Sequence, residues 1–314
     1  MELQFWGVRG SYPSPLLPEN YLAKIDEIVC MAIRQRVTLK TKQEFIDSLP
    51  VDLKTVYGGN TSCVTISDGD NLLILDGGTG LRVLGDKLLK CGLLHNYHNH
   101  LNMIFSHTHL DHINGVPFFL PLYNKDVSID FYSVHPNLEK ILETQQQSHY
   151  HPVNFHKMGA KKNFKQLDEE QPVMIGSLKV ENLRLNHPNG SFAYKITDAN
   201  GKKIVYATDA EYKANDYDRY VEFYRDADLL IYDAQYTILD LAYFYDYGHS
   251  TPVMGVDFAV LANVKKLLLF HHNPAYNEKQ IHEGLITAKE YLSQKYKNEN
   301  LEIIIANEGM TFNL

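Results

Sequence analysis

The sequence contains few cysteines, no long apolar run and no excess of basic residues. Its three cysteines, Cys30, Cys63 and Cys91, form no C-x-x-C pair, so neither a disulfide framework nor a thiolate zinc site is expected. No apolar run approaches the roughly 18 residues that a membrane-spanning helix needs. The first residues lack a basic stretch followed by an apolar one, so no signal peptide is predicted. These absences predict a soluble, cytoplasmic protein with no membrane partner.

The balance of charge limits the partners. Acidic residues outnumber basic residues by 38 to 30, which gives a formal net charge of −8. A general nucleic-acid binder needs a basic surface to neutralise phosphates, so nucleic acid is not the expected partner. The chain has 314 residues, enough to bury a large core, and its hydrophobic content of 44% is ordinary for a globular protein.

Short β-rich runs alternate with helical patterns, which predicts an α/β or α+β class instead of a strictly alternating doubly wound sheet. The predicted strands are Leu3–Val8, Cys63–Ser67, Asn71–Asp76, Leu101–Ser106, Ser128–Val134, Val173–Asn186, Phe192–Thr197, Lys203–Thr208, Asp228–Tyr232, Lys266–Phe270 and Leu301–Ala306. The predicted helices are Glu19–Arg34, Thr41–Ser48, Leu81–Lys90, Pro136–Gln147, Pro252–Ala262 and Glu278–Tyr296. A capping hydroxyl followed by proline, in Ser250-Thr251-Pro252, predicts the start of the fifth helix.

The organisation predicted for residues 1–314 is one domain with a helical insertion at 13–55. No repeat or linker divides the chain, but the stretch Pro13–Thr55 is charged, helical in pattern and bounded by prolines and glycine-rich turns. A solvated surface insertion is favoured for this stretch over a lid or an oligomer contact. If the stretch is instead an oligomer contact, the protein could form a homodimer.

The strongest local signal is a cluster of histidines and an aspartate. His107, His109, Asp111 and His112 follow directly after an apolar strand that ends at Phe105. Alternate positions 107 and 109 can aim at one point, and the chain then curls into a helix that brings Asp111 and His112 to a second point nearby. Imidazole and carboxylate groups are the ligands that zinc and similar divalent ions prefer.

Three further residues each close an apolar run. They are His187, Asp209 and His271. Taken singly, each could simply be a polar residue at the point where a strand ends at the protein surface. Because all three follow the histidine cluster in this order, a binuclear metal centre is the better interpretation.

The ordered motif set resembles the metallo-β-lactamase superfamily over nearly the whole chain. The resemblance implies a four-layer αββα sandwich with a pair of divalent metal ions at one edge of the sheets. Zinc is the first expectation, with manganese or iron as alternatives. The implied ligands are His107, His109 and His187 for one metal and Asp111, His112 and His271 for the other, with Asp209 bridging. Asp76, in the motif Leu75-Asp-Gly-Gly-Thr-Gly80, is implied to support the site without ligating.

Further motifs resemble the phosphodiesterase branch of that superfamily. The segment Gly248-His-Ser-Thr-Pro252 looks like the H-S-T segment of tRNase Z-like members. The segments Trp6-Gly-Val-Arg-Gly-Ser11 and Tyr57-Gly-Gly-Asn-Thr-Ser62 are similar to phosphoribosyl cyclic phosphodiesterases. The cluster His107-Thr-His-Leu-Asp-His112 also matches class II cyclic-nucleotide phosphodiesterases. This resemblance implies hydrolysis of a small cyclic phosphodiester, either a 3′,5′-cyclic nucleotide such as cAMP or cGMP, or a phosphoribosyl cyclic phosphate.

Several alternatives stay open at this stage. A tRNase Z-like endonuclease that processes RNA 3′ ends would use the same metals, as would a thioesterase or a lactonase, because a fold does not choose its substrate. A non-hydrolytic metal-binding protein on the same scaffold is disfavoured by the complete ligand set.

If the protein is a phosphodiesterase, roles can be predicted for individual residues. Asp111 would orient or deprotonate water, and His249 would donate a proton to the leaving alkoxide, unless it is only a polar residue that caps a helix. Arg9 would contact a substrate phosphate or form a structural salt bridge. The turn at Asn189 would offer backbone donors near the metals. His272 would face away from the site in a supporting role.

A tyrosine-rich run precedes His249. It extends from Tyr232 to Tyr247 and includes Tyr236, Tyr243 and Tyr245. Its rings could stack on a nucleobase. Core packing is the favoured interpretation.

Overall fold

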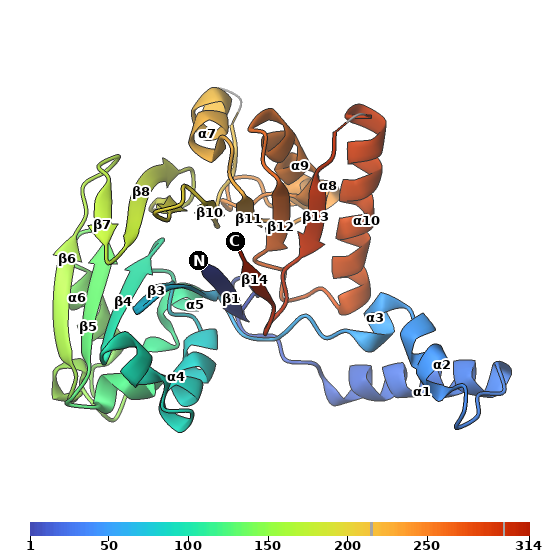
Figure 1. The fold of residues 1–314 in the computed structure, drawn as a ribbon, viewed down its shortest axis with the longest axis horizontal. Helices are drawn as coiled ribbons and strands as arrows, with labels where there is room; N and C mark the ends of the chain where they lie inside the picture. Colours follow the sequence, from blue (N-terminus) through green and yellow to red (C-terminus); the bar gives the residue numbers. More distant parts are fainter. Residues whose placement is uncertain (214–215, 298) are drawn as a thin grey trace.

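The computed structural model describes residues 1–213, 216–297 and 299–314. Two sheets lie face to face, with helices on both outer sides (Figure 1). In order across the first sheet, the strands are β14 (Thr311–Asn313), β1 (Glu2–Gly7), β2 (Cys63–Asp68), β3 (Asn71–Leu75), β4 (His100–Phe105), β5 (Ser128–Ser133) and β6 (Lys161–Gln166). The second sheet runs β13 (Glu302–Ile305), β12 (Lys266–Phe270), β11 (Leu229–Asp233), β10 (Lys203–Ala207), β9 (Ser191–Thr197), β8 (Leu178–Leu185) and β7 (Val173–Ile175).

Each sheet contains a parallel half and an antiparallel half. Strands β3 to β6 are parallel to one another, and so are β10 to β13. The sequence of a parallel strand that is buried on both faces is a continuous apolar run. The fully buried strand Leu229–Asp233 is an example. This arrangement brings the carboxyl ends of the central strands to one edge, where ligands bind in open α/β sheets.

The core has three layers of apolar contacts. Phe5 and Ile104 of the first sheet meet Tyr206 and Phe270 of the second in the cluster between the sheets. The outer faces of the two sheets pack against different helices. The fold is therefore the predicted four-layer αββα sandwich.

The helices lie outside the two sheets. They are α1 (Pro18–Arg34), α2 (Lys42–Ser48), α3 (Val51–Lys54), α4 (Gly80–Lys90), α5 (Leu110–Ile113), α6 (Leu138–Gln145), α7 (Tyr217–Tyr224), α8 (Ile238–Tyr243), α9 (Pro252–Leu261) and α10 (Glu278–Lys295). Helix α4 packs on the first sheet, whereas α9 and α10 pack on the second (Figure 1). The predicted start at Pro252 is confirmed, and the Thr251 hydroxyl accepts a hydrogen bond from the Met254 amide. Within the described ranges, no helix is long and apolar enough to cross a lipid bilayer.

The segment 13–55 forms an arm that extends away from the sandwich (Figure 1). The arm comprises α1, α2 and α3. At its base, the Lys24 ammonium donates to the carbonyls of Asp52 and Thr55 at 2.7 and 2.9 Å. The same ammonium lies 3.5 Å from the Glu278 carboxylate on α10, so it ties the arm to the second helical layer.

Some elements differ from the prediction. The single strand expected over Val173–Asn186 is a hairpin of β7 and β8, because Gly176 turns the chain with a φ of 58°. Strand β6, with the polar sequence KKNFKQ, and the three-residue β14 lie at the sheet edges and show no buried apolar pattern. The helices α7 and α8 were also missed by sequence reasoning. Both are short and rich in residues that favour strands.

Candidate metal centre

The site forms where strands from both sheets end. His107 follows β4, His187 follows β8, Asp209 follows β10 and His271 follows β12. The two sheets are joined beside it. The His272 amide donates to the Val8 carbonyl at 2.9 Å, and the Gly10 amide donates to the His272 carbonyl at 3.0 Å. The end of β12 is thus fixed to the end of β1.

One group of donors consists of His107, His109 and His187, whose candidate ligand atoms lie within 4.8 Å of one another. His187 Nε2 lies 3.0 Å from His109 Nδ1. Both His107 Nε2 and His187 Nε2 lie 3.8 Å from the Asp209 Oδ1 atom. Burial lowers the pKa of His187 to about 4 and that of His107 well below its usual value. Neutral imidazole is the form that ligates metal.

A second group consists of Asp111, His112, Asp209 and His271. His112 Nε2 lies 3.2 Å from Asp209 Oδ2 and 3.3 Å from Asp111 Oδ2. His271 Nε2 lies 3.4 Å from Asp209 Oδ2 and 3.2 Å from Asp111 Oδ2. Asp209 therefore presents one oxygen to the first group and the other oxygen to the second. This is the placement expected of a residue shared between two ions.

The chemistry of the donors fits divalent cations. The Nε2 atoms of His107 and His112 are buried and accept or donate no hydrogen bond among the described residues. Burial alone would lower the pKa of His112, but the carboxylates of Asp209 and Asp111 outweigh it and raise that pKa well above its usual value. Buried carboxylates of this kind require compensating positive charge, which divalent ions supply.

Asp76 lies behind the second group and supports it. Its Oδ2 accepts hydrogen bonds from His112 Nδ1 at 2.8 Å, from the Ser106 hydroxyl at 2.7 Å and from the Tyr206 hydroxyl at 2.7 Å. The contact with Nδ1 leaves His112 Nε2 directed toward Asp111 and Asp209. A partner on the far nitrogen fixes the orientation and tautomer of a metal-binding histidine.

The backbone at three of these strand ends is left-handed. The φ angles of Asp76, Asp209 and His271 are 60°, 54° and 59°. Such a conformation costs a non-glycine residue on the order of 1–3 kcal/mol, and it persists where the surrounding structure enforces it. All three residues belong to the candidate site or its support.

His249 lies beside both donor groups. Its ring centroid is 5.2 Å from those of His187 and His271, and its Nδ1 lies 3.9 Å from Asp209 Oδ1. The same Nδ1 lies 2.9 Å from the Asp233 carboxylate. Sequence reasoning missed Asp233, although it closes the buried strand β11 in the same way that Asp209 follows β10.

Arg9 was predicted to contact a substrate phosphate or to form a salt bridge. It is buried and donates to the backbone carbonyls of Gly58, Asn273 and Tyr276 at 2.8, 3.1 and 2.9 Å. These bonds use Nε and one of the two terminal nitrogens of the guanidinium. Arg9 therefore ties the end of β1 to the segment before α10.

Two other predicted residues lie outside the cluster of donors. Asn189 is exposed in a turn, and the amide of the following Gly190 is bonded to the His187 carbonyl at 2.7 Å. The Gly190 amide is therefore already bonded within the turn. His272 faces away from the donors, as expected from strand alternation, and its Nε2 donates to the Ala306 carbonyl at 2.8 Å.

Comparisons with curated proteins show short regions of similarity. Ribonuclease Z of Rippkaea orientalis is 31% identical over 115 residues, which cover 36% of this chain and 33% of that protein. Ribonuclease Z of Sulfurisphaera tokodaii is 38% identical over 84 residues, or 27% of each chain. The chain thus aligns with about a third or less of the length of these relatives.

Solved structures share the fold over almost the whole chain. The metallo-beta-lactamase fold protein YhfI of Bacillus subtilis has a TM-score of 0.65 at 18% identity, covering 99% of this chain and 98% of that one. The short form of human tRNase Z has a TM-score of 0.63 at 19% identity, covering 100% and 99%. Unliganded yeast PDE1 has a TM-score of 0.61 at 14% identity, again covering 100% and 99%.

A family model decides the classification. The model described as "Beta-lactamase superfamily domain" matches residues 73–272. This range contains both donor groups together with Asp76, Asp233 and His249. The chain therefore belongs to the beta-lactamase superfamily.

Proposed function

We propose that the protein is a binuclear-metal-dependent phosphodiesterase that hydrolyses a small cyclic phosphodiester. Its substrate class is a 3′,5′-cyclic nucleotide such as cAMP or cGMP, or a phosphoribosyl cyclic phosphate. The observation that carries the proposal is the His249–Asp233 pair, 2.9 Å apart, at the edge of the metal donors. Cleavage of a phosphodiester releases an alkoxide, which needs a proton, and an imidazole held by a carboxylate can supply it.

Two divalent ions per chain would occupy the two donor groups. His107, His109 and His187 would hold one ion, Asp111, His112 and His271 would hold the other, and Asp209 would bind both. Zinc is the first choice for histidine and aspartate ligands, although manganese and iron accept the same set. When bound, such ions polarise phosphoryl oxygens and lower the pKa of water at the site.

The chain's own residues would then orient the reactants. The Ser11 amide donates to Asp111 Oδ2 at 2.7 Å, which limits how that carboxylate can turn. Asp111 would orient the attacking water or accept its proton. Because His249 Nδ1 is engaged by Asp233, its Nε2 is the nitrogen that would deliver a proton to the leaving oxygen.

Product analysis tests the proposal. The zinc- or manganese-loaded protein is incubated with 3′,5′-cyclic AMP, with Asp111→Ala as the control. We expect the wild type alone to release a linear monophosphate. Absence of product in a sample that carries two metals would count against the cyclic-nucleotide substrate, and ribosyl cyclic phosphates would be tested next.

A second candidate is RNA 3′-end processing, as the names of the ribonuclease Z relatives suggest. One structural feature favours it. Between Glu27 and Glu44 the arm has no acidic residue, and its tip exposes Arg34, Arg36, Lys40 and Lys42. The net charge of −8 opposes it. An RNA-processing enzyme would bind tRNA with an affinity that falls steeply with salt concentration, whereas a small-molecule enzyme would not.

The remaining parts of the proposal concern location and assembly. The three cysteines are free in the structure, and two of them are exposed. Free thiols suit a reducing compartment such as the cytoplasm. A homodimer is compatible with the projecting arm, and size-exclusion chromatography with light scattering would test it.

A further inference from the structure

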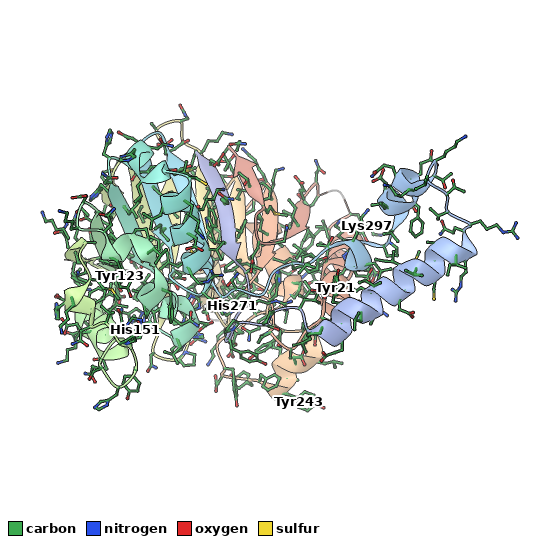
Figure 2. The ribbon with its side chains drawn as sticks, turned by 90° about the horizontal axis from the view of Figure 1, so that it is seen from below. Tyr21, Tyr123, His151, Tyr243, His271 and Lys297 are labelled. Atoms are coloured by element: carbon green, nitrogen blue, oxygen red, sulfur yellow. The ribbon has the colours of Figure 1, made fainter. Side chains whose placement is uncertain are left out.

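The segment 243–247, between α8 and His249, exposes three tyrosine rings. Tyr243, Tyr245 and Tyr247 are 83%, 63% and 60% exposed, whereas Tyr232 and Tyr236 are buried. The core packing expected for the whole run thus holds only for its first part. In Figure 2, Tyr243 points away from the body of the protein, while His271 lies toward its centre. Clustered exposed aromatic rings mark a binding surface.

A continuous series of ring contacts connects this surface to His249. The Tyr236 ring packs edge-on against His249, with centroids 5.4 Å apart. Tyr236 stacks on Phe244 at 5.3 Å, and Phe244 contacts Tyr247 at 5.5 Å. The carbonyl of the next residue, Gly248, accepts a hydrogen bond from His187 Nδ1 at 2.8 Å. Tyr247 is therefore held at the border of the candidate metal centre, and Tyr243 and Tyr245 lie within four residues of it in the sequence.

The charge of the segment indicates what kind of ligand it accepts. Residues 237–249 contain Asp240 and Asp246 but no lysine or arginine. The nearby Lys213 ammonium lies 2.8 Å from the Asp246 carboxylate, which neutralises it. A surface for a polynucleotide backbone needs cations along the strand. The same Lys213 ammonium lies 5.5 Å from the centroid of the Tyr245 ring, and its charge is offset by Asp246. A segment with aromatic faces and no lysine or arginine of its own fits an uncharged planar ring, such as a nucleobase.

We propose that Tyr243, Tyr245 and Tyr247 form the binding surface for the base of a small cyclic nucleotide. The inference rests on the proposed phosphodiesterase function and names its substrate class more closely. The phosphate would lie at the metal donors and His249, and the base would stack on the exposed rings. A ribosyl cyclic phosphate without a base would use the same metals and gain nothing from the tyrosines.

The test compares substrates with and without a base. The triple variant Tyr243→Leu/Tyr245→Leu/Tyr247→Leu keeps apolar side chains but removes the rings, and the corresponding triple phenylalanine variant keeps the rings. Tyr21→Leu, on the exposed face of the arm, is the matched control. The substrates are 3′,5′-cyclic AMP and methyl riboside 3′,5′-cyclic phosphate, which has the same ring without the base. Metal content is measured for every variant.

We expect the leucine variant to raise KM for cyclic AMP about 5- to 150-fold with little change in kcat. KM for the baseless substrate should stay unchanged, and the phenylalanine and Tyr21→Leu variants should resemble the wild type. Equal changes for both substrates, or no change for either, would overturn the inference while leaving the proposed function intact.

If the metal-loaded wild type hydrolyses neither substrate, the proposed function fails and binding decides the inference separately. The Kd of AMP is then compared with that of ribose 5-phosphate. Tighter binding of AMP that the leucine variant abolishes supports a base-binding surface. Equal affinities in the wild type refute it.

Discussion

His249 and Asp233 form a buried hydrogen-bonded pair, with Nδ1 of the imidazole 2.9 Å from Oδ2 of the carboxylate. Neither residue belongs to the two proposed metal-ligand sets. We expect His249→Ala to lower kcat by about 10²- to 10⁴-fold, because the leaving oxygen loses its proton donor. Two metals per chain should be retained, as measured by atomic emission. Loss of metal from this variant would contradict the role of proton donor.

The same pair also predicts what happens to kcat when only the Asp233 carboxylate is replaced. In Asp233→Asn the side chain keeps its size but loses the carboxylate that contacts His249 Nδ1. We expect kcat to fall while KM and metal content stay close to those of the wild type. Asp240→Asn, at the half-buried capping box on α8, is the control and should leave kcat unchanged.

Asp209 and Asp111 should differ in how many metals they hold. Asp209 faces both donor groups, whereas Asp111 contacts only the second. Asp209→Ala is expected to leave less than about one metal per chain, and Asp111→Ala about one, because each ion needs its full set of ligands. Titration with zinc followed by elemental analysis measures this. Equal losses in the two variants would exclude a bridging role for Asp209.

Gly248 should be intolerant of a side chain. Its φ is 84°, and an added Cβ would lie 2.2 Å from His187 Nδ1. Gly248→Ala should displace the His187 ring and deplete the first metal. Gly201→Ala is the matched control, since its φ is 77° and nothing lies within 4 Å of the added atom. That control should lower the free energy of unfolding by about 1 kcal/mol, the backbone cost alone, with both metals kept.

Acid should remove a stabilising contact on the first sheet, far from the metal donors. Asp130 accepts hydrogen bonds from Lys165 at 2.5 Å and from Asn163 at 2.7 Å. Burial alone would raise the pKa of Asp130, but these donors and the charge of Lys165 lower it. Since the folded pKa lies below the unfolded value of about 4, the contribution is present at neutral pH and lost as pH falls through the folded pKa.

Urea denaturation of the metal-free protein across this range measures the effect. The samples are metal-free because acid would also release bound ions, and that release would change the free energy of unfolding as well. The free energy of unfolding should fall less steeply with acid in Asp130→Asn than in the wild type. Parallel curves for the two proteins would show that Asp130 does not contribute.

The donors could be located from sequence because parallel strands end at a common edge. His187, Asp209 and His271 each follow an apolar run, and the structure brings them beside the histidine cluster. Asp233 obeys the same rule but looked like an ordinary turn residue, since only its contact with His249 distinguishes it. The left-handed backbone of Asp209 has no sequence signal of its own, because aspartate is common in turns.

Long-range contacts explain what sequence reasoning could not supply. Arg9 was predicted to contact a phosphate or to form a salt bridge. Its actual partners are carbonyls of Gly58, Asn273 and Tyr276, which no local pattern connects to it. In the tyrosine run, residues of the same type divide into buried and exposed ones. The sequence composition does not show which tyrosines are buried, because that depends on where α8 and the segment after it run.

The hydrogen bonds between Val8 and His272 also constrain how the protein is made. Val8 and His272 are separated by 264 positions in the sequence (272 minus 8). Pairing across so much of the chain is slow, because loop closure must be achieved before the contact stabilises it. The first donor group can gather once Asp209 has been synthesised, but the second also needs His271. The full set of proposed ligands is therefore assembled only when the segment that carries His271 has docked beside the end of β1.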